Sequence, residues 1–507
     1  MDPIARAAAA HPERAAVIDG ERAVSWRQYD DARNRLAGAL AGLGVGGGEH
    51  VVVYAHNAYE VLLAGAVVRA LGAIAVPMNH RLTAEEVAYI LDDSDAVALV
   101  AGDAFLPIVE RVRDAAPRLR HVILLGAERR PWARHLDDLL ASGSPAPVAA
   151  PPGLGGSMVY TAGTTGKPKG ARRRATDPAA LLPRLAALSC VAPDAVHLAA
   201  GPLYHSAPGG FALYAHALGQ TVVVMRRFDA EQALRLIERH RCTTTFMAPT
   251  LLKRIVDLPA DVRRRHDLSS MRSIVVAAAP CPMRVKEEVT ALFGPVLHEF
   301  YGSTELGINT VLAPADVLRK PGSCGRAAPG VELAILDDAG RPLPAGHPGE
   351  LHVKRYEGVF DGYYKKEAAT RETQHGDWLS VGDVAWMDAE GFVYICDRKR
   401  DMIISGGVNI YPAEIEDVLH RHPDVEDVAV FGVPDAEWGE RVHAAVQPRA
   451  GRAPAAADLI AFCRTHLADY KAPREVSFHA DFPRDSAGKL VKRVLREPHW
   501  AGRTSRV

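Results

Sequence analysis

The stretch Tyr160-Thr161-Ala162-Gly163-Thr164-Thr165-Gly166-Lys167-Pro168-Lys169-Gly170 places glycines, hydroxyl groups and cations in one predicted loop after an apolar segment. Glycines let backbone N–H groups come close to an anion. The side chains of Thr161, Thr164 and Thr165 add hydroxyl donors, and Lys169 adds positive charge. The stretch therefore predicts a loop that binds polyphosphate, with a nucleoside triphosphate as the natural ligand.

This loop differs from the phosphate loop of ordinary ATPases. Gly163 and Gly166 are too close together for a Walker A motif, and Lys167 is followed by Pro168 instead of Ser or Thr. A second glycine pattern, Gly42 to Gly47, satisfies G-x-G-x-x-G, but it follows a helical stretch and precedes a strand, which is the reverse of the dinucleotide-binding order. We interpret it as the C-terminal turn of a helix.

Composition describes a globular protein of more than one domain. The chain has 507 residues, of which 48% are hydrophobic and 24% charged, and its formal net charge is −1. No overall field would attract nucleic acid or anionic lipid, so neither is an expected partner. The N-terminal residues lack a secretory pattern, no apolar stretch is long enough to span a bilayer, and the six cysteines lack metal-site or disulfide spacing. A cytoplasmic location is expected.

Short apolar segments alternate with helical stretches along the first two thirds of the chain, which indicates parallel sheets covered by helices. The predicted buried strands are 51–54, 96–100, 121–125 and 221–225. Residues 145–153 form a Pro/Ala/Gly connector before the phosphate loop, and the region from Gly349 is richer in strands and turns. A charged cluster at 397–401 marks a predicted boundary, after which 412–419 is a helix start and 428–431 a strand of a small α+β unit.

Further motifs stand in a fixed order after the phosphate loop. They are Tyr301-Gly302-Ser303-Thr304-Glu305, Val381-Gly382-Asp383, Asp397-Arg398-Lys399-Arg400-Asp401, Ser405 to Glu414, and Pro483 to Lys489. Together with the loop, this set resembles the adenylate-forming superfamily of acyl- and aryl-CoA synthetases, peptide-synthetase adenylation domains and luciferases. The resemblance runs from near the N-terminus to about residue 496. It implies a large α/β N-terminal domain (1–397) with two helix-covered sheets and a small β-barrel-like subdomain, a hinge (398–401), and a small mobile α+β domain (402–507).

The resemblance also assigns nucleotide contacts. Thr161, Thr164, Thr165 and Lys169, with Gly163 and Gly166, would hold the β- and γ-phosphates, Thr304 would contact the α-phosphate, and Glu305 would bind Mg²⁺, which favours oxygen ligands. Asp383 and Arg398 would hold the ribose. The remaining nucleotide contacts would be Ala278, Ala279, Pro280, Tyr301, Gly302, Ser303 and Ile395. On residue type alone, Glu305 could equally be a helix N-terminal acid, Gly382-Asp383 a plain turn and Arg398 a solvated charge.

The resemblance gives the C-terminal domain two tasks. Lys489 would neutralise the substrate carboxylate and the α-phosphate during adenylation, and rotation at Arg400 would then withdraw it. Gly406 and Gly407 would flank a tunnel for the pantetheine arm of CoA. His205 would gate the acyl pocket, although a lone histidine beside apolar residues is more often a core side chain.

This sequence departs from the common pattern of the family in a few places. Asp397, Val381 and Ala162 replace glycine, threonine and serine, which are mild changes. Arg172-Arg173-Arg174 replaces a hydrophobic pair followed by Thr-His. These arginines are either a solvated basic turn or contacts to ATP or CoA phosphates.

The predicted activity is an AMP-forming ligation of a carboxylic acid, expected to be an apolar fatty or aryl acid, to CoA with ATP and Mg²⁺. The acid pocket is predicted from small residues, Ala207, Gly209, Gly210 and 277–279. Transfer of the acyl group to a carrier protein or an amine is the alternative. A catalytically inactive nucleotide-binding protein and a luciferase-like oxygenase are more remote alternatives. The acid itself is not determined, and a homodimer is expected only because symmetric dimers are common.

Overall fold

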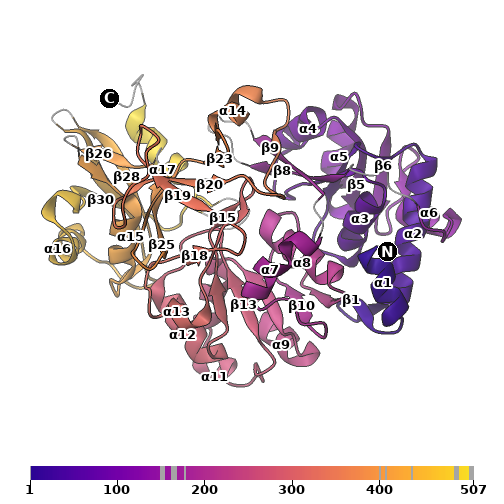
Figure 1. Ribbon diagram of the computed structural model, residues 1–507, viewed down its shortest axis with the longest axis horizontal. Coiled ribbons are helices and arrows are strands. Elements are labelled where there is room, and N and C mark those ends of the chain that lie inside the picture. The colour runs from indigo at the N-terminus through magenta and orange to yellow at the C-terminus, as the bar shows by residue number, and fades with distance from the viewer. Residues whose placement is uncertain are drawn as a thin grey trace.

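The computed structural model describes residues 2–148, 155–161, 168–175, 178–398, 401–405, 408–435, 438–484 and 490–501. Figure 1 shows three regions: an indigo and purple region at the right, a magenta and pink region below it, and an orange and yellow region at the left. Within the described ranges, no helix is both long and apolar enough to cross a membrane.

An eight-stranded sheet carries the predicted phosphate loop. Its order is β21(Gly362–Tyr363), β9(Lys169–Arg174), β8(Gly156–Thr161), β4(Ile74–Pro77), β3(His50–Tyr54), β5(Ala96–Gly102), β6(His121–Leu125) and β7(Arg134–His135). Strands β8, β4, β3, β5, β6 and β7 pair in parallel, whereas β9 is antiparallel to both of its neighbours, β8 and β21. The helices of this region are α2(Trp26–Gly42), α3(Tyr59–Ala70), α4(Ala84–Asp93), α5(Leu106–Val112) and α6(Leu136–Ser142).

A seven-stranded sheet forms the second large layer. Its order is β14(Leu297–Glu299), β13(Ser273–Val276), β12(Thr244–Met247), β10(Val196–Ala199), β11(Thr221–Val224), β1(Ala15–Asp19) and β2(Arg22–Ser25). Its helices are α1(Pro3–Ala10), α7(Pro178–Ala187), α8(Ser206–Ala217), α9(Ala230–His240), α10(Pro249–Val256), α11(Ala260–Arg263) and α12(Met283–Phe293). Helices α2 and α3 share one apolar core with strands of both large sheets, because Leu40 and Leu63 pack in the same cluster as Val17 and Val51.

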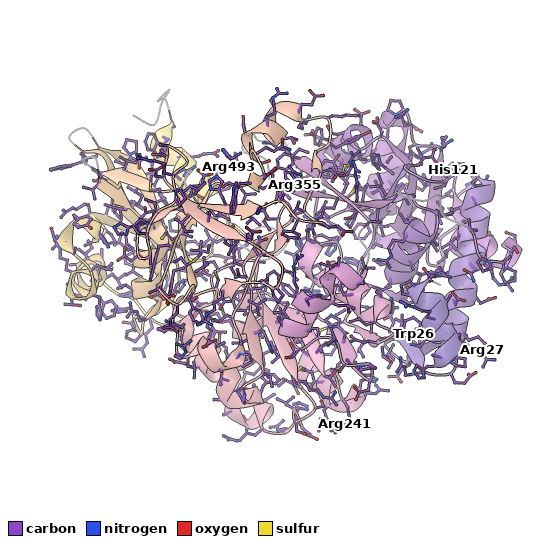
Figure 2. All side chains as sticks on the ribbon, viewed as in Figure 1. Trp26, Arg27, His121, Arg241, Arg355 and Arg493 are labelled. Carbon is purple, nitrogen blue, oxygen red and sulfur yellow. The ribbon has the colours of Figure 1, made fainter. Side chains whose placement is uncertain are left out.

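The start of α2 shows how local signals and burial agree. Ser25 and Gln28 form a reciprocal capping box. Trp26, which follows Ser25, is fully buried, and its ring packs on that of His216 with centroids 5.5 Å apart. The neighbouring Arg27 points to solvent (Figure 2). The cap therefore starts the helix at the point where its first side chain enters the core.

Smaller β elements join the large sheets to the C-terminal region. A six-stranded sheet contains β22(Gln374–His375), β23(Trp378–Leu379), β20(Gly349–Lys354), β24(Asp383–Met387) and β25(Val393–Arg398), with β19(Leu333–Leu336) paired to β20. Two ribbons pair β15(Gly302–Ser303) with β16(Gly307–Ile308), and β17(Thr310–Val311) with β18(Arg326–Ala327). Helices α13(Pro314–Val317) and α14(Glu367–Glu372) lie in this region.

The C-terminal region has its own sheet and core. The sheet order is β27(Val408–Ile410), β26(Ile403–Ser405), β29(Gly439–Pro448) and β28(Val425–Asp435), and β30(Glu475–Phe478) pairs with β29. Helices α15(Pro412–His420) and α16(Ala456–His466) pack on it, and α17(Lys492–Trp500) ends the region. Ile415, Val430 and Leu459 belong to one buried cluster made of residues from this region alone.

The predicted fold class is confirmed by these layers, and each predicted strand coincides with an observed one, except that the strand predicted at 221–225 ends one residue earlier, at Val224. The large sheets are not purely parallel, however, because antiparallel edge strands extend both of them. Helix α2 ends at Gly42, and Gly44 has a φ of 75°, so the glycine-rich segment is the helix-ending turn that we predicted.

Candidate functional site

Residues of the first and second motifs meet at the end of strand β8. Thr161 is the last residue of β8 and pairs in register with Lys169, the first residue of β9. The Thr161 hydroxyl lies 3.3 Å from Glu305 Oε1, although 144 residues separate them in the chain. Lys169 Nζ lies 5.3 Å from the centre of the Tyr363 ring. The predicted phosphate and metal residues are therefore neighbours.

Glu305 lies in the turn between β15 and β16, so it is not the helix N-terminal acid that residue type alone allowed. It is 7% exposed, and its carboxylate accepts hydrogen bonds from two neutral hydroxyls, Thr161 and Tyr363, the latter at 2.9 Å. Among the described residues, no lysine or arginine forms an ion pair with it. A buried carboxylate surrounded by hydroxyl oxygens is a donor set that suits Mg²⁺.

Thr304 and His205 come together at the N-terminus of helix α8. The hydroxyl of Ser206, the first residue of α8, lies 2.8 Å from the hydroxyl of Thr304. His205 is the N-cap residue of that helix, and its ring packs on Tyr204 with centroids 4.3 Å apart. The candidate α-phosphate contact and the candidate gate therefore share one corner of the cleft.

The candidate ribose residue sits at the start of β24. Asp383 is 7% exposed, and its Oδ2 accepts a hydrogen bond of 2.5 Å from the hydroxyl of Tyr301. Asp383 therefore begins a strand and does not lie in a plain turn. Ile395 and Tyr301 line the same cleft.

The small-residue strip after β13 has an unusual backbone. Ala278 has a φ of 78°, in the left-handed region that favours glycine. Ala278 and Pro280 are exposed to the cleft, and Ala277, which directly follows the strand, is buried. The turn therefore places peptide groups and small side chains along the cleft wall at a cost in backbone strain.

Several predicted site residues lie outside the described residues. They are Gly163, Thr164, Thr165, Gly166, Arg400, Gly406, Gly407 and Lys489, together with the side chain of Arg398. The backbone of Arg398 is described, and it pairs in register with Asp383 across β24 and β25.

Sequence reasoning missed three residues that support the site. Tyr363 donates to Glu305, and Ser206 bonds Thr304. Asn57 is buried, donates to the carbonyl oxygens of Gly201 and Met225, and accepts from the N–H of Leu203, which holds the segment that leads to His205. None of the three carries a charge, so none stood out as a candidate site residue. The only sequence signal was the glycine-tyrosine pair at 362–363, which could have drawn attention to Tyr363.

The three consecutive arginines form the end of strand β9, so they are not a basic turn. Arg172 and Arg174 point to the same side, where both approach Asp361, at 3.9 and 2.9 Å. Arg173 points to the opposite side of the strand, and both Arg173 and Arg174 line the cleft. The alternation along the strand thus separates Arg172 and Arg174, which approach a carboxylate, from Arg173, which has no carboxylate partner among the described residues.

A group of aromatic rings continues the cleft wall beyond His205. His80 packs edge-to-face on Tyr204, with centroids 5.0 Å apart, and on His56 at 4.6 Å. Burial, assisted by the charges of His56 and Arg81, lowers the pKa of His80 to about 4. His80 is therefore uncharged at neutral pH, and this part of the wall is apolar in character.

Comparison with known proteins agrees with this arrangement. The sequence pattern of the AMP-binding enzyme family matches residues 4–364, and that of the AMP-binding enzyme C-terminal domain matches residues 414–489. The first match spans the two large sheets with the phosphate loop, and the second lies within the separate C-terminal region.

Three similar proteins use different acyl acceptors according to their names. The fatty acid–[acyl-carrier-protein] ligase ScoC of Streptomyces coeruleorubidus is 34% identical, covering 98% of this chain and 95% of that protein. Indoleacetate–CoA ligase of Aromatoleum aromaticum is 35% identical and covers 97% of both. The structure of the amide bond synthetase McbA of Marinactinospora thermotolerans matches with a TM-score of 0.88 at 30% identity, covering 98% of this chain and 99% of that one. The chain belongs to the AMP-binding enzyme family, and it is an acid-activating ligase of the adenylate-forming superfamily.

Proposed function

We propose that this protein joins a carboxylic acid to CoA in two steps through an acyl-adenylate. In the first step, an oxygen of the acid attacks the α-phosphorus of ATP and pyrophosphate leaves. In the second, the thiol of CoA attacks the acyl carbon, AMP leaves, and the thiol proton is released. The observation that carries the proposal is the meeting of Thr161, Lys169, Thr304 and Glu305 at one corner of the cleft.

The first step needs stabilisation of negative charge on phosphorus more than proton transfer. Lys169 and the hydroxyls of Thr161 and Thr304 are the donors that would bind phosphate oxygens. Glu305 would hold Mg²⁺, which supplies positive charge at the phosphates when bound. The hydrogen bond from Tyr363 fixes the orientation of the Glu305 carboxylate.

The nucleoside would lie between β24 and the strip after β13. Asp383, oriented by Tyr301, would accept hydrogen bonds from the ribose hydroxyls, with Arg398 as a second ribose contact. Residues 278–280, 301–303 and Ile395 would contact the adenine and the rest of the nucleoside. This placement agrees with their common position along the cleft.

The two steps would be separated by rotation of residues 402–507 relative to residues 1–397, about a hinge at 398–401 that contains Arg400. Before rotation, Lys489 would face the acid and the α-phosphate. After rotation, Gly406 and Gly407 would leave room for the pantetheine arm. The separate sheet and core of the C-terminal region support the proposal, because such a unit can move as a body.

CoA is the proposed acceptor, and a carrier protein or an amine is the second candidate. The second candidate follows from the similarity to a carrier-protein ligase and to an amide bond synthetase. Incubation with ATP, an acid and either CoA, a carrier protein or an amine, followed by mass spectrometry, distinguishes them by the mass of the product.

Replacement of Lys489 by methionine tests the two-step scheme. We expect acid-dependent pyrophosphate exchange to fall by about a hundredfold or more, because a positioned charge is lost at the developing negative charge. Thioester formation from a chemically prepared acyl-adenylate and CoA should change far less.

Lys471→Met is the matched control, since Lys471 lies in the same region but pairs with Glu414 at 2.7 Å. It should leave the exchange rate close to that of the wild type. An equal loss of both half-reactions in Lys489→Met, or no loss in either, would contradict the scheme.

A further inference from the structure

Strand β9 carries two basic side chains on its cleft face, at different depths. Lys169, Ala171 and Arg173 alternate with Gly170, Arg172 and Arg174. Because each strand residue advances about 3.3 Å, Arg173 lies about 13 Å along the strand from Lys169. It pairs with Ser157, near the start of β8, whereas the phosphate loop follows the end of β8. Arg173 is therefore displaced from the phosphate loop.

The guanidinium of Arg173 reaches the hairpin that follows Glu305. Its Nη2 lies 2.6 Å from the position that a Cβ atom on Gly307 would occupy, and the Tyr356 hydroxyl lies 2.9 Å from the same position. Any larger residue at 307 would thus collide with both groups. Arg173 Nε is buried and makes no hydrogen bond.

Arg184 places a second guanidinium over the ring of Tyr356. It extends from helix α7, is only 5% exposed, and its Cζ atom lies 4.0 Å from the centre of the Tyr356 ring. Its Nε donates to the carbonyl oxygen of Pro329 at 3.2 Å. Burial raises the pKa of Tyr356, and the positive charges of Arg184 and Arg173 both oppose that rise.

Neither guanidinium has a carboxylate partner in the part of the chain that the structure describes. Asp361 is engaged by Arg172 and Arg174 on the opposite face of β9. Arg184 is buried and Arg173 is half-buried. A cation withdrawn from water without a counter-ion opposes folding, and a bound anion would supply the missing charge. Both arginines line the cleft, so an anion can reach them.

We propose that the arginine pair, Arg173 and Arg184, binds a second carboxylate at the end of the acid that is remote from the reacting carboxylate. This inference rests on the proposed function and names its substrate class, a dicarboxylic acid with an apolar body. The rings of Phe211, Phe246 and Phe300 line the same cleft, with centroids 5.4 and 6.1 Å from Phe211, and would contact that body.

The test compares matched acids in the pyrophosphate-exchange assay. The probes are straight-chain α,ω-dicarboxylates of increasing length with the monocarboxylates of equal length, and 3-(4-carboxyphenyl)propanoate with 3-phenylpropanoate. The wild-type protein should use at least one diacid with a kcat/KM about tenfold or more above that of its matched monoacid, as a fork-shaped arginine contact to carboxylate provides.

Arg173→Leu and Arg184→Met should each lower the ratio of diacid to monoacid kcat/KM by about tenfold or more. Arg172→Leu is the matched control, because it removes a guanidinium from the same strand on the opposite face, and it should leave the ratio unchanged. Arg184→Lys, which keeps the charge but not the fork, should give an intermediate ratio and serves if the methionine variant does not fold.

Three results would overturn the inference. The first is equal use of diacids and monoacids by the wild type, which leaves the proposed function intact. The second is a rise in KM for ATP in Arg173→Leu with the acid ratio unchanged, which would make Arg173 a phosphate contact. If no acid of either series supports exchange, the proposed function fails and the inference falls with it.

Discussion

Two places in this protein bury basic side chains in opposite ways. Lys286 of helix α12 is 2% exposed and forms an ion pair with Glu299 of strand β14, which is 7% exposed. Arg184 is 5% exposed and Arg173 is half-buried with its Nε atom removed from solvent, but no carboxylate among the described residues accompanies them. The first pair is neutral without a ligand, and the second carries net positive charge.

The difference indicates that the charge of Lys286 serves the folded structure, whereas the charges of the arginine pair are directed at a ligand. At Lys286, burial opposes the charged forms of both partners and their mutual attraction restores them, so the pKa of Lys286 remains raised. At the arginine pair, the protein itself supplies no such compensation. A cation that the fold leaves unpaired marks a place where binding an anion stabilises the protein.

The largest expected effect comes from breaking the neutral pair. Lys286→Met leaves Glu299 buried without its partner, and we expect a loss of about 3–5 kcal/mol in the free energy of unfolding, measured by denaturant titration. The double variant Lys286→Met/Glu299→Leu should recover most of the loss, because no charge then remains. A single variant as stable as the wild type would contradict a structural role for the pair.

A third way to bury a basic side chain is to keep it uncharged, as His216 and His197 are, and the dependence of stability on pH tests it. Burial is the main cause that lowers the pKa of His216 to about 3 and that of His197 to about 4. Each folded-state pKa lies below the unfolded value near 6.5. The contribution of each neutral histidine to the free energy of unfolding is therefore fully present above pH 6.5 and is lost as the pH falls toward 4. The loss approaches about 1.4 kcal/mol per pH unit for each histidine.

Carboxylates titrate in part of the same range, so the wild type should be compared with His216→Gln. The glutamine variant lacks the histidine contribution, and its stability deficit should shrink steadily below pH 6.5. A deficit that stays constant from pH 7.5 to pH 4.5 would mean that His216 titrates normally in the folded protein.

Removing one arginine of the unpaired set should affect stability much less than removing Lys286. Arg173→Leu eliminates a charge that no described carboxylate balances, so we expect the free energy of unfolding to stay within about 1 kcal/mol of the wild type or to increase. Denaturant titration without ligand measures this. A loss as large as that of Lys286→Met would show that Arg173 is held by a partner within the protein.

The smallest expected effect concerns the backbone of the cleft. Ala278 adopts a φ of 78°, which opposes folding, and glycine would relieve this strain while increasing the freedom of the unfolded chain. Since these contributions have opposite signs, Ala278→Gly should change stability by less than about 1 kcal/mol. Ala277→Gly, at a buried strand-end position, is the control and should only destabilise.

The sequence predicted the site best where the signal was local. Thr161 and Lys169 flank a glycine-rich loop whose composition alone indicates phosphate binding, and Glu305 belongs to a contiguous motif. Tyr363 was not predicted, because its importance depends on a hydrogen bond to Glu305 across 58 residues. Likewise, the motif at 172–174 indicated positive charge, but not which of its three members reaches Gly307.

By itself, the sequence determined the class of the protein: helix-covered sheets, a phosphate loop and the ordered motifs of an acid-activating ligase. These properties depend on periodicity and on short motifs, which are local in the chain. Only the tertiary structure decided which charges are neutralised, since pairing depends on atoms brought together from distant elements. The same three-residue run therefore places two arginines against Asp361 and directs the third toward Gly307 and Tyr356, where helix α7 adds Arg184.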